Sequence, residues 1–350
     1  MKKRKLITAA FSLVITAFLL TACNNNGKSN TDTLSDSSIK EAPLSSTDYP
    51  LIITHALGET VLKSKPERVA AIGWENQDTP LALGVIPVGV SAANYGLVTK
   101  NRLHPWTYDA FKALGEEQPL VFDDVDGLDY ETISDVEPDV ILASYSGLTK
   151  EEYELLSQIA PVIPYQTAPW QTYWREQTIL NATGMGMKKE GEAKVAETEA
   201  LIKEKVSAHP ELAGTKTAFC FISPDDFSTF YVYLPSDPRA AYLTDLGLAF
   251  PESIIELQEG STDFSISLSR ENADQLYDVE MMVIYGDQSL LDALQADPLM
   301  SEIPAIKDGA VVLVDNNSQL AGACTPSVLS IPAEIDEYLD LLSKAHGKIK

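Results

Sequence analysis

Short runs of apolar residues, each bounded by turn-forming residues, alternate with helical patterns along the first half of the chain. These runs cover residues 68–72, 87–90, 138–144 and 161–165. Runs of this length are typical of buried strands. A short helix is predicted between the first two runs, with Asp78 as its N-cap, Pro80 near its first turn and Gly84 after its end. The order strand, helix, strand predicts a βαβ unit with parallel pairing.

The same order of elements returns after Pro210. Strands are expected at residues 217–222, 230–234, 279–285 and 310–314. Leu246-Gly247 closes a helix opened by Asp237-Pro238-Arg239, as Leu83-Gly84 closes the helix in the first half. The order of the strands and the Leu-Gly pairs that close the helices agree in the same register. Together they predict an internal repeat and therefore two lobes of similar topology.

One long helical pattern without proline, Lys188 to Ala208, separates the two halves. Its apolar positions form a single stripe at helical spacing, Val195, Thr198, Ile202 and Val206. Alanines at 193, 196 and 200 form a second patch of small residues, so we expect the helix to pack on two bodies at once. His209 ends it, because the residue before a proline is disfavoured in the α region.

The predicted fold class is therefore α/β, with two doubly wound, Rossmann-like lobes joined by a single long helix. Ligands of such sheets bind outside the carboxyl ends of the strands, and pockets favour domain interfaces. We expect the ligand cleft between the lobes. The predicted boundaries are residues 48–170 for the N-terminal lobe, 171–209 for the linker helices and 210–350 for the C-terminal lobe.

The first residues predict export. Four basic residues at 2–5 precede an apolar stretch at 6–20, which is typical of a signal peptide over residues 1–22 and too short for a membrane span. Leu20-Thr21-Ala22-Cys23 resembles a bacterial lipobox, which implies lipidation of Cys23; an ordinary signal peptide with an incidental cysteine is the alternative. Residues 23–47, rich in Asn, Ser, Thr and Asp, indicate a disordered tether. The expected location is the extracytoplasmic face of a Gram-positive cell membrane.

The charge balance excludes one class of partner. The formal net charge is −25, and removing the four basic residues at 2–5 leaves 22 basic against 51 acidic residues, or −29. Nucleic-acid binding needs a basic footprint, so nucleic acid is not expected as a partner.

Motifs for catalysis and resident metals are absent from the sequence. The four histidines, at 55, 104, 209 and 346, show no metal-ligand spacing, so no metal or cofactor is predicted. There is no GxSxG, P-loop or GxGxxG motif, and we expect no enzyme activity. An exported α/β enzyme and a surface sensing or adhesion protein stay as alternatives. Cys220 and Cys324 are expected as idle thiols, with a disulfide between them left open.

Several short motifs carry a resemblance. They include Leu83-Gly84 followed by Pro87-Val88-Gly89-Val90, then Glu137-Pro138-Asp139, Ile159-Ala160-Pro161 and Asp297-Pro298-Leu299. With the lipobox, they resemble the iron-siderophore and vitamin B12 substrate-binding proteins of ABC importers, over about residues 48–345. The resemblance implies a monomeric receptor that binds a ferric siderophore between its lobes and delivers it to ABC permease subunits, with cobalamin or haem as alternative ligands. It also implies that Glu131 and Glu271 dock on the permease.

Aromatic and arginine side chains are the candidate ligand-binding residues. The resemblance implies Trp74, Tyr95, Tyr145 and Phe264, and Trp74 and Tyr145 also follow the ends of predicted strands. Trp170 and Tyr233 are further aromatic candidates. The arginines left for an anionic chelate are Arg102, Arg175 and Arg239. The sequence departs from the family in two places, because Gly96 stands where hydroxamate-binding members carry an arginine, and the arginine that catechol-binding relatives carry near Leu320 is absent. These departures leave the ligand class open.

Overall fold

The computed structural model describes residues 49–124 and 126–350. The signal peptide predicted for residues 1–22, the lipidation of Cys23 and the tether of residues 23–47 lie outside the described residues. Across the described ranges, no helix combines the length and the apolar character that crossing a membrane requires.

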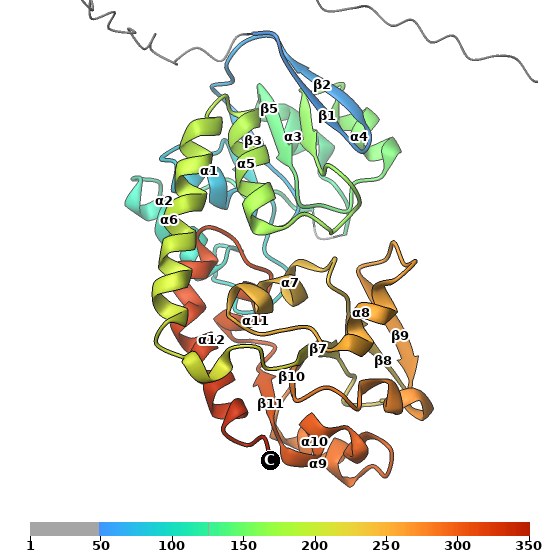
Figure 1. Ribbon diagram of the computed structural model, residues 1–350. Helices are drawn as coiled ribbons and strands as arrows, with labels where there is room; N and C mark the ends of the chain where they lie inside the picture. The colour runs from blue at the N-terminus through green and yellow to red at the C-terminus, as the bar shows by residue number, and fades with distance from the viewer. Residues whose placement is uncertain (1–48, 125) are drawn as a thin grey trace, which may run out of the picture. The chain divides into compact units, whose positions relative to one another are not determined.

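The described chain forms three β-sheets and two groups of helices (Figure 1). The strands are β1 Leu51–His55, β2 Gly58–Leu62, β3 Val69–Ala71, β4 Gly89–Val90, β5 Val140–Ala143, β6 Val162–Pro164, β7 Thr217–Phe221, β8 Thr229–Tyr233, β9 Ser265–Ser269, β10 Met281–Tyr285 and β11 Val311–Val314. The α-helices are α1 Asp78–Ala82, α2 Pro105–Ala113, α3 Tyr130–Asp135, α4 Lys150–Leu156, α5 Trp174–Gly184, α6 Lys188–Val206, α7 Pro238–Asp245, α8 Glu252–Gln258, α9 Gln288–Ala296, α10 Pro304–Asp308, α11 Gln319–Ala323 and α12 Ser330–His346. Short 3-10 helices are η1 Pro210–Leu212, η2 Arg270–Leu276 and η3 Met300–Glu302.

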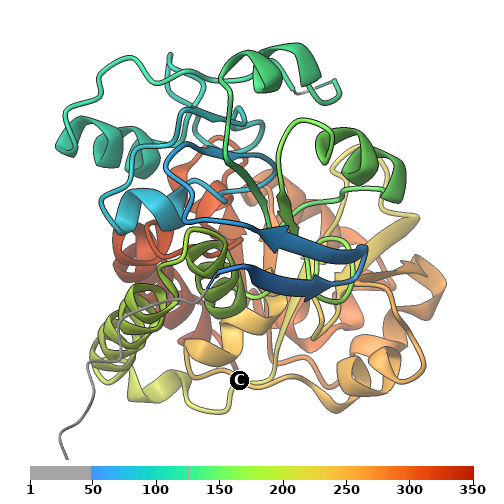
Figure 2. The same ribbon diagram turned by 90° about the horizontal axis from the view of Figure 1, so that it is seen from above.

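The sheet of the N-terminal lobe is parallel throughout, in the order β4-β3-β5-β6. Successive residues of its strands enter two different apolar cores: Val140 and Leu142 face one, and Ile141 and Ala143 face the other. Burial of both faces explains why β5 reads as a continuous apolar run. The antiparallel β1–β2 hairpin packs beside β6, where Ala56 N donates to Tyr165 O (3.2 Å; Figure 2).

The C-terminal sheet confirms the repeat in strand order. Its order is β11-β10-β7-β8-β9, so β7, β8, β10 and β11 neighbour each other as β3, β4, β5 and β6 do. The strands β10, β11 and β7 run parallel, and their residues also alternate between two apolar cores. The α/β class with two doubly wound lobes is therefore confirmed.

One strand pairing differs from the predicted repeat. Strand β8 runs antiparallel to β7, whereas β4 runs parallel to β3; the helix that opens at Asp237 follows β8, as predicted, whereas α1 precedes β4. The connection at residues 222–228 is too short for a crossover helix, which parallel pairing would need. After Leu246-Gly247 the chain makes a single parallel bridge, Lys216 to Ala249, where the first half has the strand β4.

The linker helix α6 packs with one stripe and not two. Val195, Thr198 and Ile202 are buried against α5 and α12, whereas the alanines at 193, 196 and 200 are exposed. The expected alanine patch was therefore wrong, because both neighbouring helices lie against the same side of α6. Figure 1 shows α12, in red, running beside α6. The C-terminal helix therefore packs along the linker helix and reinforces it.

Residues 91–118, whose sequence pattern indicates a long loop between two predicted strands, contain the helix α2. Pro105 occupies its first turn, and Trp106 and Phe111 are buried in it. The signal for this helix was in the sequence, because a proline at the first helical position is a start signal.

Candidate functional site

A cavity of about 370 Å³ lies where the two sheets end. It is lined by Trp74, Tyr95, Tyr145, Trp170, Phe221, Tyr233, Arg239, Phe264, Tyr285, Ala321 and Thr325. We call this cavity the aromatic pocket. Its volume falls in the range of small-molecule sites.

The carboxyl ends of the strands place the pocket's aromatic side chains. Trp74 and Tyr145 follow β3 and β5 in the N-terminal lobe, and Tyr285 ends β10 in the other. Gly73 makes the turn before Trp74 with a φ of +80°, and a Cβ there would lie 2.8 Å from the Tyr145 carbonyl oxygen. Only glycine therefore allows the two strand ends to approach closely enough to present both side chains.

Aromatic contacts build the pocket wall across the lobes. The rings of Tyr95 and Tyr285, from different lobes, lie edge to face at 5.3 Å, and Tyr95 Oη donates to Asn316 (2.6 Å). Trp170 lies 5.4 Å from Tyr145 with its ring nearly perpendicular. Such pairs hold the rings in place before any ligand arrives.

Trp170 is held in an uncommon backbone conformation. Its φ is +59°, and its amide donates to the Ser146 carbonyl (3.1 Å). Its indole packs directly on Gly147, where a Cβ would meet the ring nitrogen at 2.5 Å. A bulky residue in this region stores strain that its surroundings must offset, which is typical of functional sites.

Arg239 is the single cation among the residues that line the pocket, and its charge is already paired. Its Nε and Nη2 donate to the two oxygens of Asp237 at 2.9 and 2.7 Å, and its guanidinium stacks on Tyr233 at 3.8 Å. Burial would lower the pKa of Arg239, but the Asp237 carboxylate outweighs burial and raises it. The pair places no net charge in the pocket.

Two predicted arginines lie away from the pocket. Arg102 pairs with Asp123 (2.9 Å) on the surface of the N-terminal lobe, in a turn with a φ of +63°. Arg175 stacks on Trp174 and pairs with Glu199 and Asp245 (2.6 and 2.8 Å). Arg175 thus clamps α5 to α6 and α7. The structure brings the other seven candidates together and leaves these two out.

The two departures from the family pattern have structural reasons. Gly96 has a φ of +74°, and a Cβ there would lie 2.7 Å from the backbone nitrogen of Gly322. Leu320 is 1 % exposed in a core of the C-terminal lobe. An arginine at either position would clash or be buried in apolar surroundings.

A family model for periplasmic binding proteins matches residues 69–318. The chain belongs to the periplasmic binding protein family. This family is made of substrate-binding proteins and not of enzymes, which confirms that expectation. Relatives of the chain include periplasmic binding proteins and substrate-binding lipoproteins of ABC transporters.

The chain is similar to several substrate-binding proteins. It is 47% identical to PiaA of Streptococcus pneumoniae TIGR4, solved in complex with ferrichrome, with a TM-score of 0.83 over 85% of this chain and 99% of that one. It is 26% identical to the Fe(3+) dicitrate-binding periplasmic protein FecB of Escherichia coli, covering 77% of this chain and 86% of that protein. It is also 26% identical to the putative ABC transporter substrate-binding lipoprotein YhfQ of Bacillus subtilis, covering 77% and 82%.

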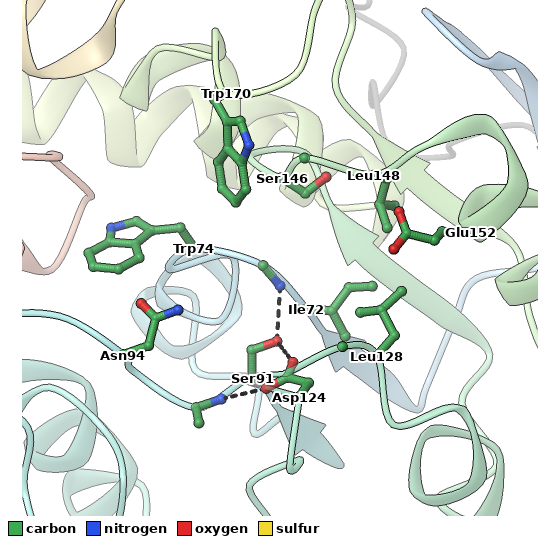
Figure 3. Close-up of a pocket in the computed structure, with 14 residues that line it drawn as sticks. Ile72, Trp74, Ser91, Asn94, Asp124, Leu128, Ser146, Leu148, Glu152 and Trp170 are labelled. Atoms are coloured by element: carbon green, nitrogen blue, oxygen red, sulfur yellow. Dashed lines mark hydrogen bonds between the residues drawn. The ribbon is translucent and has the colours of Figure 1, made fainter. Parts of the chain in front are cut away.

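In the present protein, a second cavity of about 320 Å³ lies beside the aromatic pocket (Figure 3). Trp74 and Trp170 line both cavities. Two carboxylates, Asp124 and Glu152, line only the second one. Asp124 accepts hydrogen bonds from the Ser91 hydroxyl and, at 3.2 Å, from the backbone of residue 92, while burial raises its pKa. We call this cavity the acidic annex.

A cluster of buried ionisable groups lies behind Trp74. Glu75 and His104, each with a side chain 2 % exposed, pair at 2.8 Å between Oε1 and Nδ1. His104 Nε2 lies 2.9 Å from the Tyr95 carbonyl, and its ring lies 5.4 Å from Trp74. The pair therefore supports two walls of the pocket.

Asp78 completes this cluster, which we call the buried junction (Glu75, Asp78, His104 and Ser327). Ser327, from the segment before α12, donates to Asp78 at 2.5 Å, and Thr107 and Trp106 donate at 2.8 and 3.1 Å. The predicted N-cap role of Asp78 was wrong, because Gln77 occupies that position and the carboxylate points into the interior. Burial and the Glu75 charge raise the pKa of Asp78 to about 8.

Sequence reasoning missed some residues of both sites. Tyr285 ends a predicted strand and Phe221 is the second-last residue of another, so attention to strand ends would have found both. Nothing in the local sequence pointed to the buried junction, since Ser327 meets Asp78 from the far end of the chain.

The predicted docking glutamates and the two cysteines lie outside the two cavities. Glu131 lies in the first turn of α3 and Glu271 in η2, one on each lobe, and both are exposed. Cys220 and Cys324 are buried free thiols, and burial raises the pKa of each to about 12. No cluster of three or more potential metal ligands occurs within residues 49–124 and 126–350.

Proposed function

We propose that this chain captures a ferric trihydroxamate siderophore outside the cytoplasm and delivers it to the permease of an ABC importer for iron uptake. The observation that carries the proposal is the aromatic pocket, whose single lining cation is neutralised by Asp237. Family membership and the similarity to PiaA, solved with ferrichrome, support the same conclusion.

The charge of the pocket decides between siderophore classes. Three hydroxamates, each with one negative charge, balance Fe³⁺, so their complex is neutral, whereas a tris-catecholate complex is strongly anionic. An anionic chelate would need unpaired arginines, because a buried charge without a partner is costly. The Arg239–Asp237 pair offers no such surplus. A neutral complex therefore fits best.

The roles of the site residues follow from this chemistry. The rings that line the pocket pack on the organic shell of the chelate. Arg239, whose Nε and Nη2 are held by Asp237, donates through Nη1 to the oxygens around the iron. The protein supplies no iron ligand, because the metal arrives already bound. The roles of Trp74, Tyr95, Tyr145, Trp170, Tyr233 and Phe264 as ligand contacts are part of this proposal, as are those of Phe221 and Tyr285.

Several attachments of the receptor belong to the same proposal. A lipid on Cys23 anchors the protein to a Gram-positive cell surface, and residues 23–47 give it reach. It works as a monomer and binds no nucleic acid. Glu131 and Glu271 contact the two permease subunits, one from each lobe.

Titration of intrinsic fluorescence tests the ligand class, because tryptophans line the pocket. We expect a neutral ferric trihydroxamate to quench the emission with a Kd in the micromolar range or below, and ferric tris-catecholate and ferric citrate to bind at least tenfold more weakly. Binding of cobalamin or haem without any response to the trihydroxamate would contradict the proposal.

Arg239→Lys tests the mode of binding in the same titration. Lysine keeps the charge but loses the planar fork, so we expect roughly tenfold weaker binding of the trihydroxamate. Arg102→Lys, the same change outside the pocket, is the control and leaves the Kd unchanged. Equal affinities of both variants would remove Arg239 from the ligand contacts.

A further inference from the structure

The acidic annex continues the ligand-binding surface beyond the aromatic pocket. It lies wholly in the N-terminal lobe, over the carboxyl ends of β3, β4 and β5, where parallel sheets bind ligands. Its wall toward the aromatic pocket is made of Trp74 and Trp170, which both cavities share. A ligand held in the pocket therefore has the annex within reach of any arm that it carries.

The charges of the two cavities differ. Among the residues that line the annex, Asp124 and Glu152 are carboxylates and none is Lys, Arg or His. In Figure 3 Asp124 lies below the indole of Trp170, beside Ser91, and Glu152 lies to the right of it, beside Leu148. The aromatic pocket, by contrast, holds a neutral Arg239–Asp237 pair. The annex thus brings negative charge to the edge of an otherwise neutral site.

The protein's own hydrogen bonds to Glu152 use one of its carboxylate oxygens, whereas those to Asp124 use both. Glu152 accepts the backbone and hydroxyl hydrogen bonds of Thr149 with Oε2 alone, as the capping box of α4, so Oε1 remains for another partner. Asp124 is anchored by Ser91, which also accepts a hydrogen bond from Gly73 N (2.9 Å). Burial raises the pKa of Asp124, which a cation placed in the annex would reverse.

Indole faces and carboxylates together are the groups that bind ammonium ions. Tryptophan is the best aromatic partner for a cation, and a carboxylate adds a charge-assisted hydrogen bond. We infer that the acidic annex binds a protonated amino group on an arm of the chelate whose iron centre occupies the aromatic pocket. This inference rests on the proposed function and narrows its ligand to trihydroxamates that carry a primary ammonium.

Two matched chelates test the inference. One is a linear ferric trihydroxamate that ends in a primary amine, and the other is its N-acetylated derivative, which has the same iron centre without the positive charge. By titration of the whole exported chain at neutral pH, we expect the amine form to bind roughly tenfold more tightly. The preference should shrink at high salt, because the two carboxylates are partly open to solvent.

A matched pair of variants assigns the preference to the annex. Glu152→Gln keeps the capping hydrogen bonds of α4 and removes the charge, so the preference for the amine form should fall to about threefold or less while the acetylated form keeps its Kd. Glu154→Gln is the control, because this glutamate is exposed on the same helix and does not line the annex. It should keep the full preference.

The outcomes separate the two proposals. If neither chelate binds, the proposed function fails. If both bind with equal affinity, or if Glu152→Gln and Glu154→Gln behave alike, the siderophore proposal stands and the annex inference is overturned.

Discussion

At the scale of single residues, the buried junction places two carboxylates in the protein interior, where their desolvation costs free energy. Glu75 and Asp78 are carboxylates with 3 % and 0 % exposure, and Glu75 adopts a φ of +53° directly after Trp74. Buried charges are tolerated when they are paired and hydrogen-bonded. Here His104 and Ser327 provide those partners, and they tie the pocket wall to the segment that precedes α12.

The junction predicts how stability depends on pH. Asp78 has a pKa of about 8 in the folded protein and near 4 in an unfolded chain. Between these values the folded state holds a proton that the unfolded state has released, so stability falls as pH rises through this window. Burial also raises the pKa of Glu75, and the Glu75 carboxylate raises that of His104 against the effect of burial, so both add to the same trend.

Melting curves between pH 5 and pH 8.5 check this prediction. The wild-type melting temperature should fall across the range. Asp78→Asn should reduce the dependence of the free energy of unfolding on pH by up to about 1.4 kcal/mol per pH unit, the value for one proton, and its melting temperature should therefore fall less. Asp135→Asn, an exposed change on α3, should leave the slope unaltered. Parallel curves for wild type and Asp78→Asn would show that Asp78 does not carry the effect.

The residues also show where sequence reasoning reaches its limit. Trp74 and Tyr145 were predicted correctly to lie at strand ends, because strand ends can be read from local apolar runs. The pairing of Arg239 with Asp237 was not predicted, although the two are neighbours in sequence, since an N-cap aspartate and a free arginine give the same pattern. Arg175 was misplaced for the opposite reason, because its partners lie on α6 and α7.

At the scale of elements, α6 explains how two lobes keep their relative position. Its buried stripe joins a core that also contains Trp174 of α5 and Leu339 of α12. Gly191 allows the closest approach, since a Cβ there would lie 2.4 Å from the Cβ of Ala182. A helix packed this tightly on two others resists bending, so large rotation of the lobes is disfavoured.

Unfolding in urea tests this single-stripe packing. Ile202→Ala removes a side chain that is 4 % exposed, and we expect a loss of about 2–4 kcal/mol in the free energy of unfolding. Ala196→Ser, on the exposed face of the same helix, should change it by no more than about 0.5 kcal/mol. A large cost at Ala196 would instead support the second packing face that the alanines suggested.

Elements were predictable where their signals were local. The strands β5, β10 and β11 and the helix α6 were recovered with small shifts at their ends. Helix α2 was missed because aromatic and charged residues at 91–118 resembled a loop. The antiparallel pairing of β8 with β7 was missed because the repeat favoured parallel pairing. Only the short connection at residues 222–228 argues against a parallel pair.

At the scale of the whole molecule, the repeat gives the receptor two similar surfaces. Glu131 and Glu271 stand at equivalent positions of the two halves and are both exposed. A permease built from two similar subunits would present two similar sites, and one carboxylate per lobe matches that arrangement. Neither residue lines the aromatic pocket or the acidic annex.

The double variant Glu131→Ala, Glu271→Ala separates capture from delivery. Because both side chains lie outside the two cavities, we expect the Kd for the trihydroxamate to stay within about twofold. Uptake of ⁵⁵Fe-labelled chelate by cells that carry the variant should fall at least tenfold, since two charged contacts with the permease are lost.

A control with the same charge change makes the uptake result specific. Glu190→Ala with Glu204→Ala removes two exposed carboxylates from α6, so net charge and solubility change equally. This control should transport iron normally. If both double variants lose uptake alike, the effect reflects overall charge and not docking; if Glu131→Ala, Glu271→Ala instead weakens chelate binding in solution, these carboxylates act on the pocket. Loss confined to the first pair, with capture intact, is the result that two-lobed docking requires.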